Sequence, residues 1–67
     1  MIDIQVNGEV RSVDREMSID ALLRSLDLQP RMIVVEHNGE IIRRDRYDQV
    51  QVGAGDALEL VHFVGGG

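Results

Sequence analysis

One short stretch of helical periodicity, placed between two strand-like halves, constrains the fold of this 67-residue chain more than any other feature. Its apolar stripe recurs at i, i+3, i+4 and i+7 and consists of Ile19, Leu22, Leu23 and Leu26. Ser18 can cap the helix, and Pro30 stops it because the residue before a proline avoids the helical region. A helix of about eight residues is not stable alone, so we expect it to lie on a sheet.

The residues before the helix predict a β-hairpin. Apolar and polar residues alternate over residues 2–6, which is the period of a half-buried strand. Asn7-Gly8 then gives a strong turn signal, since both central residues of a type I′ turn need positive φ. The return strand covers Val10 to Val13. With a strict two-residue loop Val13 shares a face with Ile2 while Val10 lies opposite, so the register stays open.

The residues after the helix predict the rest of a sheet. Met32 to Glu36 is an apolar run rich in β-branched residues, consistent with a strand buried on both faces. Asn38-Gly39 supplies a second turn. The remaining segments are a short strand at 40–42, an irregular stretch or single helical turn at 43–48, a turn at 53–56 and a final strand at 58–63.

This order of elements predicts an α+β fold with a mixed sheet of four to five strands packed by one short helix. A single helix between two hairpin-like halves favours a right-handed crossover that makes the first and last strands parallel and adjacent. That arrangement is the ubiquitin-like β-grasp. We expect residues 1–63 to form the β-grasp domain and residues 64–67 to form a flexible C-terminal glycine tail.

Composition narrows the possible functions. The chain has no cysteine and its seven basic residues are all arginine, so it lacks the usual thiol and amine nucleophiles of covalent catalysis. Its net charge of −5 argues against nucleic-acid binding, which depends on neutralising phosphates. No apolar run approaches the roughly 20 residues of a membrane span, and no signal peptide is visible. We therefore expect a cytoplasmic protein without a membrane or nucleic-acid partner.

The sequence ends in Val64-Gly65-Gly66-Gly67, directly after the last predicted strand. At average glycine usage, three terminal glycines arise by chance roughly once in 3,000 chains. A backbone without Cβ atoms can enter a narrow channel, and four extended residues reach about 13–14 Å into another protein's active site. ATP can activate such a carboxylate as an acyl-adenylate. A sulfur nucleophile can then replace AMP and leave a thiocarboxylate, a strong nucleophile at neutral pH.

Two stretches carry a resemblance to a known family. Residues 34–47, Val-Val-Glu-His-Asn-Gly-Glu-Ile-Ile-Arg-Arg-Asp-Arg-Tyr, are similar to the central region of the thiamine-biosynthesis sulfur carriers, the ThiS family. Residues 55–67 resemble the C-terminal strand and tail of that family. The similarity covers essentially the whole chain, and its most specific part is the final strand together with the tail.

The resemblance implies a protein co-substrate, not an enzyme. Gly67 is then the residue that carries first the adenylate and later the sulfur, while Gly65 and Gly66 thread the tail into partner active sites. An E1-like adenylyltransferase activates Gly67 using ATP and magnesium, and the carrier itself binds no cofactor. The sulfur comes indirectly from a cysteine desulfurase persulfide, and thiazole synthase receives it to build the thiazole of thiamine.

The last strand also offers a docking surface. By period two, Val61 and Phe63 lie on one side and Leu58 and Leu60 on the other. One pair faces the helix, and the other can form an apolar patch for the activating enzyme. We name Val61, Phe63 and Val64 as docking residues, although the sequence does not decide which pair is outside.

Other polar residues favour no further site. His37 and His62 match no metal-ligand spacing, so we expect no metal, and Arg43, Arg44 and Arg46 are typical of a solvated loop. Three alternative functions remain. The small subunit of molybdopterin synthase uses the same tail chemistry, a ubiquitin-like modifier would join its tail to lysines, and a passive interaction module would not need the glycines at all.

Overall fold

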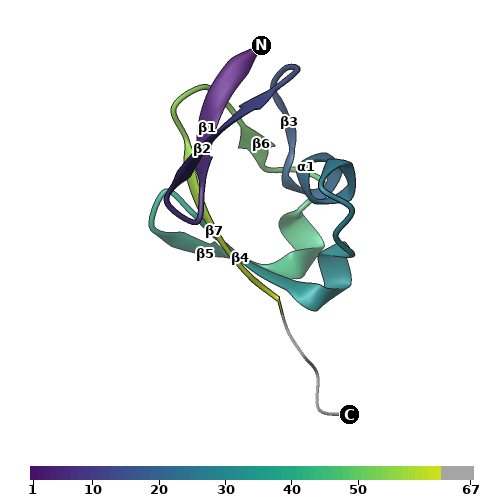
Figure 1. The fold of residues 1–67 in the computed structure, drawn as a ribbon. Helices are drawn as coiled ribbons and strands as arrows, with labels where there is room; N and C mark the ends of the chain where they lie inside the picture. The colour runs from purple at the N-terminus through teal and green to yellow at the C-terminus, as the bar shows by residue number, and fades with distance from the viewer. Residues whose placement is uncertain (63–67) are drawn as a thin grey trace.

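The computed structural model describes residues 1–62, and its main sheet has five strands in the order β2-β1-β7-β4-β5. Helix α1 packs on one face of this sheet (Figure 1). This is the predicted mixed sheet with one short helix, and the β-grasp fold is confirmed. The elements are β1 (Ile2–Val6), β2 (Glu9–Val13), β3 (Met17–Ser18), α1 (Ile19–Ser25), a 3₁₀ turn (Pro30–Met32), β4 (Ile33–His37), β5 (Glu40–Ile42), a second 3₁₀ turn (Arg44–Arg46), β6 (Gln51–Val52) and β7 (Ala57–His62).

The first hairpin has the register of a strict two-residue loop. Ile2 pairs with Val13 and Val6 pairs with Glu9. Asn7 and Gly8 have φ angles of 52° and 84°, as a type I′ turn requires. This answers the question that the sequence left open: Val13 packs against the core, whereas Val10 is 68% exposed on the opposite face.

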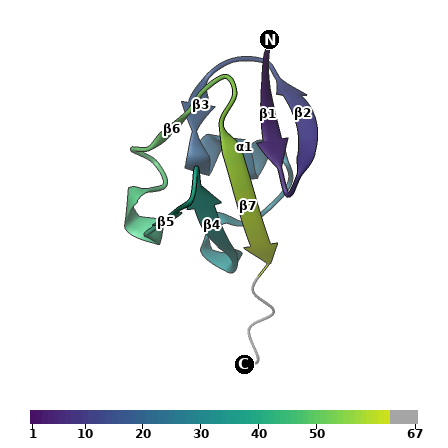
Figure 2. The same cartoon turned by 90° about the vertical axis from the view of Figure 1, so that its left-hand side faces the viewer.

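Strand β7 lies in the middle of the sheet. It runs parallel to β1, with Gln5 opposite Ala57, and antiparallel to β4, with Ile33 opposite His62. The predicted adjacency of the first and last strands is therefore confirmed (Figure 2). β7 is therefore paired on both edges, with β1 as far as Leu58 and with β4 as far as His62.

Helix α1 begins where the sequence indicates. The Ser18 hydroxyl accepts a hydrogen bond from the Ala21 N–H at 3.0 Å, which satisfies one of the free donors of the first turn. Leu26 caps the other end and is half-buried. The apolar stripe packs into a core whose buried members are Ile4, Ile19, Leu22, Leu23, Ile33, Val35, Tyr47, Val52 and Leu58.

One prediction about the sheet is wrong. The apolar run at 32–36 was expected to be buried on both faces, but in β4 only Ile33 and Val35 are buried, while Val34 is 38% exposed. The physical reason is that the single helix covers only one face of the sheet. Figure 2 shows the uncovered face, with α1 behind it. In this chain the continuous apolar run therefore belongs to a strand that is buried on one face and exposed on the other.

Two features of the middle segment were not predicted. Strands β3 and β6 form a second, two-stranded sheet, in which Met17 pairs with Val52. Tyr47 is 4% exposed, and its hydroxyl donates to the Ile33 carbonyl at 2.7 Å.

No helix within residues 1–62 is long and apolar enough to cross a membrane.

Candidate functional site

The predicted working end of the chain follows β7. Phe63, Val64, Gly65, Gly66 and Gly67 lie outside the described residues, so the roles assigned to them stay predictions. The boundary expected between residues 63 and 64 lies there as well. What the structure describes is the platform that leads into the tail: β7, the two strands beside it and the turns that hold it.

Asn7 fixes β7 near the point where the strand ends. Its backbone N–H donates to the Leu58 carbonyl at 2.9 Å. Its side-chain Oδ1 accepts from the Leu60 N–H at 2.7 Å, and its Nδ2 donates to the Leu60 carbonyl at 3.3 Å. Hydrogen bonding along this edge of β7 therefore continues beyond the end of β1, as far as Leu60.

Asn38 makes the corresponding contacts at the start of β7. Its backbone N–H donates to the Ala57 carbonyl at 2.8 Å, and its Oδ1 accepts from the Ala57 N–H at 2.8 Å. Like Asn7, it is the first residue of an Asn-Gly turn and has a positive φ, here 51°. The two hairpin turns of the fold thus hold the same strand from opposite edges.

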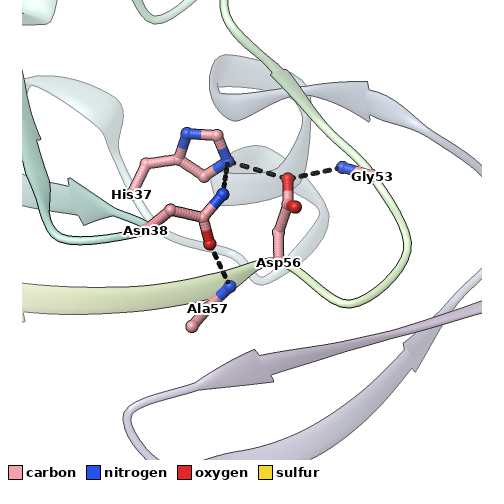
Figure 3. Close-up of polar contacts among 5 residues, drawn as sticks. All are labelled: His37, Asn38, Gly53, Asp56 and Ala57. Carbon is pink, nitrogen blue, oxygen red and sulfur yellow. Dashed lines mark hydrogen bonds and ion pairs between the residues drawn. The ribbon is translucent and has the colours of Figure 1, made fainter.

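A polar cluster joins the β4–β5 turn to the turn before β7 (Figure 3). The Asp56 Oδ2 atom accepts from the Gly53 N–H at 2.8 Å and lies 2.8 Å from Nε2 of His37. Burial acts to raise the pKa of Asp56, but the hydrogen bonds from Gly53 and His37 outweigh it and lower the pKa. The cluster has a structural role, because these contacts join His37 and Gly53 through one carboxylate oxygen of Asp56.

The face of β7 that points away from the helix carries Val61. Leu58 is 1% exposed and Leu60 is half-buried against the core, whereas Val61 is 60% exposed. The pair that faces the helix is therefore Leu58 and Leu60, which the sequence left undecided. Val61 lies directly opposite Val34 of β4, so the two exposed valines adjoin each other on the open face.

The other candidate residues lie apart. His37 and His62 lie at opposite ends of the β4–β7 ladder. No group of three metal-ligating side chains occurs within residues 1–62. Of the arginines at 43–46, the Arg43 Nε atom lies 3.7 Å from Oδ1 of Asp45, and both side chains are largely exposed. These positions agree with a solvated loop.

Sequence reasoning missed the contribution of the two turn asparagines to β7. The Asn-Gly pairs were identified as turns, but an amide side chain that reaches a strand 53 residues away leaves no local signal. The turn signal at 53–56 likewise predicts no further role for Asp56. Its position after a glycine-rich segment was the available hint, since aspartate often accepts from a nearby backbone N–H.

Comparison with known proteins identifies the family. The ThiS family model matches residues 4–67. The sulfur carrier protein ThiS of Bacillus subtilis (strain 168) is 42% identical over 65 residues, which cover 96% of this chain and 98% of that protein. The crystal structure of the thiamine biosynthesis protein (ThiS) of Geobacter metallireducens superposes with a TM-score of 0.85 at 36% identity, covering 98% of this chain and all of that one.

A thiazole synthase of Paramagnetospirillum magneticum (strain ATCC 700264 / AMB-1) also contains a similar segment. It is 45% identical over 62 residues, and these are 92% of this chain. The chain spans only 19% of the length of that enzyme. The family model, the near full-length relative and the shared fold agree with one another, and on these grounds the chain belongs to the ThiS family.

Proposed function

We propose that this protein is a sulfur carrier of thiamine biosynthesis whose working group is the α-carboxylate of Gly67. The observation that carries the proposal is the family match, which extends through residue 67 and so includes the three glycines. A relative of nearly the same length is a sulfur carrier protein. In this role the chain is a co-substrate that other enzymes load and unload, and it catalyses nothing itself.

The proposed loading reaction has three steps. A carboxylate oxygen of Gly67 attacks the α-phosphorus of ATP and expels pyrophosphate, which gives an acyl-adenylate. A persulfide sulfur then attacks the acyl carbon, so that a C–S bond forms and AMP leaves with the electron pair of the broken C–O bond. Attack by a thiol on the resulting S–S bond releases the thiocarboxylate and forms a disulfide between the thiol and the former persulfide carrier.

The reaction assigns roles to partner proteins. An E1-like adenylyltransferase binds ATP and magnesium and activates Gly67, and a cysteine desulfurase supplies the persulfide indirectly. Thiazole synthase then receives the sulfur. Thiazole synthases of two bacteria contain a segment similar to this chain, which supports an association between this domain and that enzyme.

The described platform suits this delivery. β7 is bonded on both edges, and the two asparagine contacts secure it at Ala57 and Leu60. We propose that Gly65 and Gly66 thread the tail into each enzyme, because a backbone without side chains fits a narrow channel. Val61, Phe63 and Val64 would then contact the enzyme surface around its entrance. Val61, with 60% of its surface exposed, is available for such a contact.

Intact mass spectrometry tests the proposal directly. The protein is incubated with the adenylyltransferase, ATP, magnesium and a persulfide source, and we expect one oxygen of the Gly67 carboxylate to be exchanged for sulfur. A variant lacking Gly66 and Gly67 should gain no sulfur. The matched control is Val10→Ala, an exposed change on the edge strand β2, which should load normally. An unchanged mass in the intact protein under working conditions would refute the carrier function.

Partner capture separates this proposal from the alternatives. The loaded carrier should retain thiazole synthase. Retention of the large subunit of molybdopterin synthase would indicate the second carrier function, and isopeptide conjugates that disappear on deletion of Gly67 would indicate a protein modifier. Activity that survives removal of Gly66 and Gly67 would indicate a passive interaction module.

A further inference from the structure

The open face of the sheet carries an unusual combination of side chains next to the strand that leads into the tail. The outer patch consists of Val34, Glu36, Ile41, Glu59 and Val61, which alternate along β4, β5 and β7 with residues that pack against the core. Ile41 is 64% exposed and Val61 is 60% exposed. The helix lies behind this face, as Figure 2 shows. Apolar side chains at such exposure, grouped on neighbouring strands, are typical of a contact surface.

Two carboxylates face each other inside this patch. Glu36 of β4 lies directly opposite Glu59 of β7, and the next pair on the same face of these two strands is Val34 with Val61. Like charges directly opposite on a sheet destabilise it. Among residues 1–62 the structure records no ion pair to either glutamate. Arg43, which directly follows β5, lies beside Asp45 instead.

We propose that the outer patch docks a protein surface that presents an arginine or lysine between aliphatic side chains, and that thiazole synthase carries this surface. The cation would lie between Glu36 and Glu59 and relieve their repulsion, while the aliphatic groups would cover Val34, Val61 and Ile41. This inference rests on the proposed function. Thiazole synthase is chosen because enzymes of that name contain a segment similar to this chain.

The position of the patch supports the same conclusion. Glu59 and Val61 belong to β7, the strand that ends at His62 immediately before the tail. An enzyme that holds these side chains is therefore already beside the point where the tail begins. Opposite charges across an interface also accelerate encounter, and they make affinity depend on salt.

The test is equilibrium binding of the carrier to thiazole synthase at low and at moderate salt. We expect Glu36→Gln/Glu59→Gln to weaken binding about tenfold at low salt and to flatten its salt dependence, because the paired cation loses both partners. Val61→Ser should weaken binding without changing the salt dependence. The matched control is Glu40→Gln, an exposed neutralisation on β5 whose side chain lies on the other side of the strand from Ile41.

Thermal unfolding of the same variants gives an independent readout. Removing the repulsion should leave the double glutamine variant as stable as the original protein or more stable, although it binds more weakly. Equal loss of binding in the Glu40 variant would show a non-specific charge effect and overturn the inference. Unchanged binding of the double variant, or loss of adenylyltransferase binding alone, would also overturn it.

The two proposals fail in different ways. If Gly67 gains no sulfur, the carrier function fails whatever the binding data show. If Gly67 is loaded normally but thiazole synthase binds the double glutamine variant as tightly as the original protein, only the assignment of the outer patch fails.

Discussion

Asn7 and Leu60 are paired as residues of neighbouring strands would be, although Asn7 lies in a turn. The side-chain amide of Asn7 accepts from the Leu60 N–H at 2.7 Å and donates to the Leu60 carbonyl at 3.3 Å. It supplies the acceptor and the donor that β1 would provide if it ran straight on. The strand that leads into the tail is therefore held close to its last residue by one side chain.

Replacing Asn7 with glycine should loosen the end of β7 selectively. Glycine keeps the positive φ of the turn, so the change removes mainly the two side-chain hydrogen bonds. Such bonds contribute about 1 kcal/mol each, and we expect the protection of the Leu60 amide against hydrogen exchange to fall about tenfold or more. The measurement is amide exchange followed by NMR.

Asn38→Gly is the matched control for this change. It removes the corresponding contact at the start of β7, where Oδ1 accepts from the Ala57 N–H. It should expose the Ala57 amide and leave Leu60 protected. If both variants loosened the whole strand equally, Asn7 would have no local effect on the end of β7.

Asp56 should make the protein sensitive to acid. Because its pKa in the folded state is lowered, its contribution to stability is fully present above its ordinary value of 3.8 and is lost as pH falls through the lowered pKa. Asp56→Asn should therefore unfold at a lower temperature than the original protein at pH 7, and the difference should shrink below pH 3.8. Thermal unfolding followed by circular dichroism from pH 7 to strong acid measures this difference.

An exposed aspartate provides the control for the acid prediction. Asp14 lies between β2 and β3 and is exposed. Asp14→Asn should follow the original protein over the same pH series. A constant difference between Asp56→Asn and the original protein, even in strong acid, would contradict the predicted linkage.

Local patterns were enough to predict most of the fold. The alternating strand at 2–6, the Ser18 cap and the apolar stripe of the helix each depend on neighbours in sequence, and each lies where it was expected. The parallel pairing of β1 and β7 also followed, because the order of elements allows few topologies.

Long-range contacts could not be predicted in the same way. The burial of Tyr47 and the pairing of β3 with β6 depend on where the chain returns after β5, and a stretch of polar residues does not encode that. The exposure of Val34 depends on which face of the sheet helix α1 covers, and that is also a long-range property of the fold. The C-terminal glycines have no side chains to pack, so the prediction of their role rests on resemblance and chemistry.

Tyr47 should stabilise the fold through its hydroxyl as well as its ring. The hydroxyl donates to the Ile33 carbonyl at 2.7 Å in a buried setting, and burial raises the pKa of Tyr47, which keeps the proton on the phenol. Tyr47→Phe keeps the ring and leaves that carbonyl without this donor, so we expect a loss of about 1–2 kcal/mol in the free energy of unfolding. Urea unfolding measures this loss, and a variant as stable as the original would show that the hydrogen bond contributes nothing net.

Leu22 should be among the least replaceable side chains of this small domain. It is fully buried between the helix and the sheet, with an exposed fraction of 0%. Leu22→Ala removes apolar contacts and leaves a cavity, which costs about 2–5 kcal/mol. Domains of this size have a thin core, so we expect the variant to be largely unfolded at 37 °C.

Val10→Ala is the control, because Val10 is 68% exposed and its truncation should change the unfolding free energy by less than about 0.5 kcal/mol. Equal stability of the two variants in urea unfolding would mean that the apolar stripe of α1 does not hold the sheet and helix together.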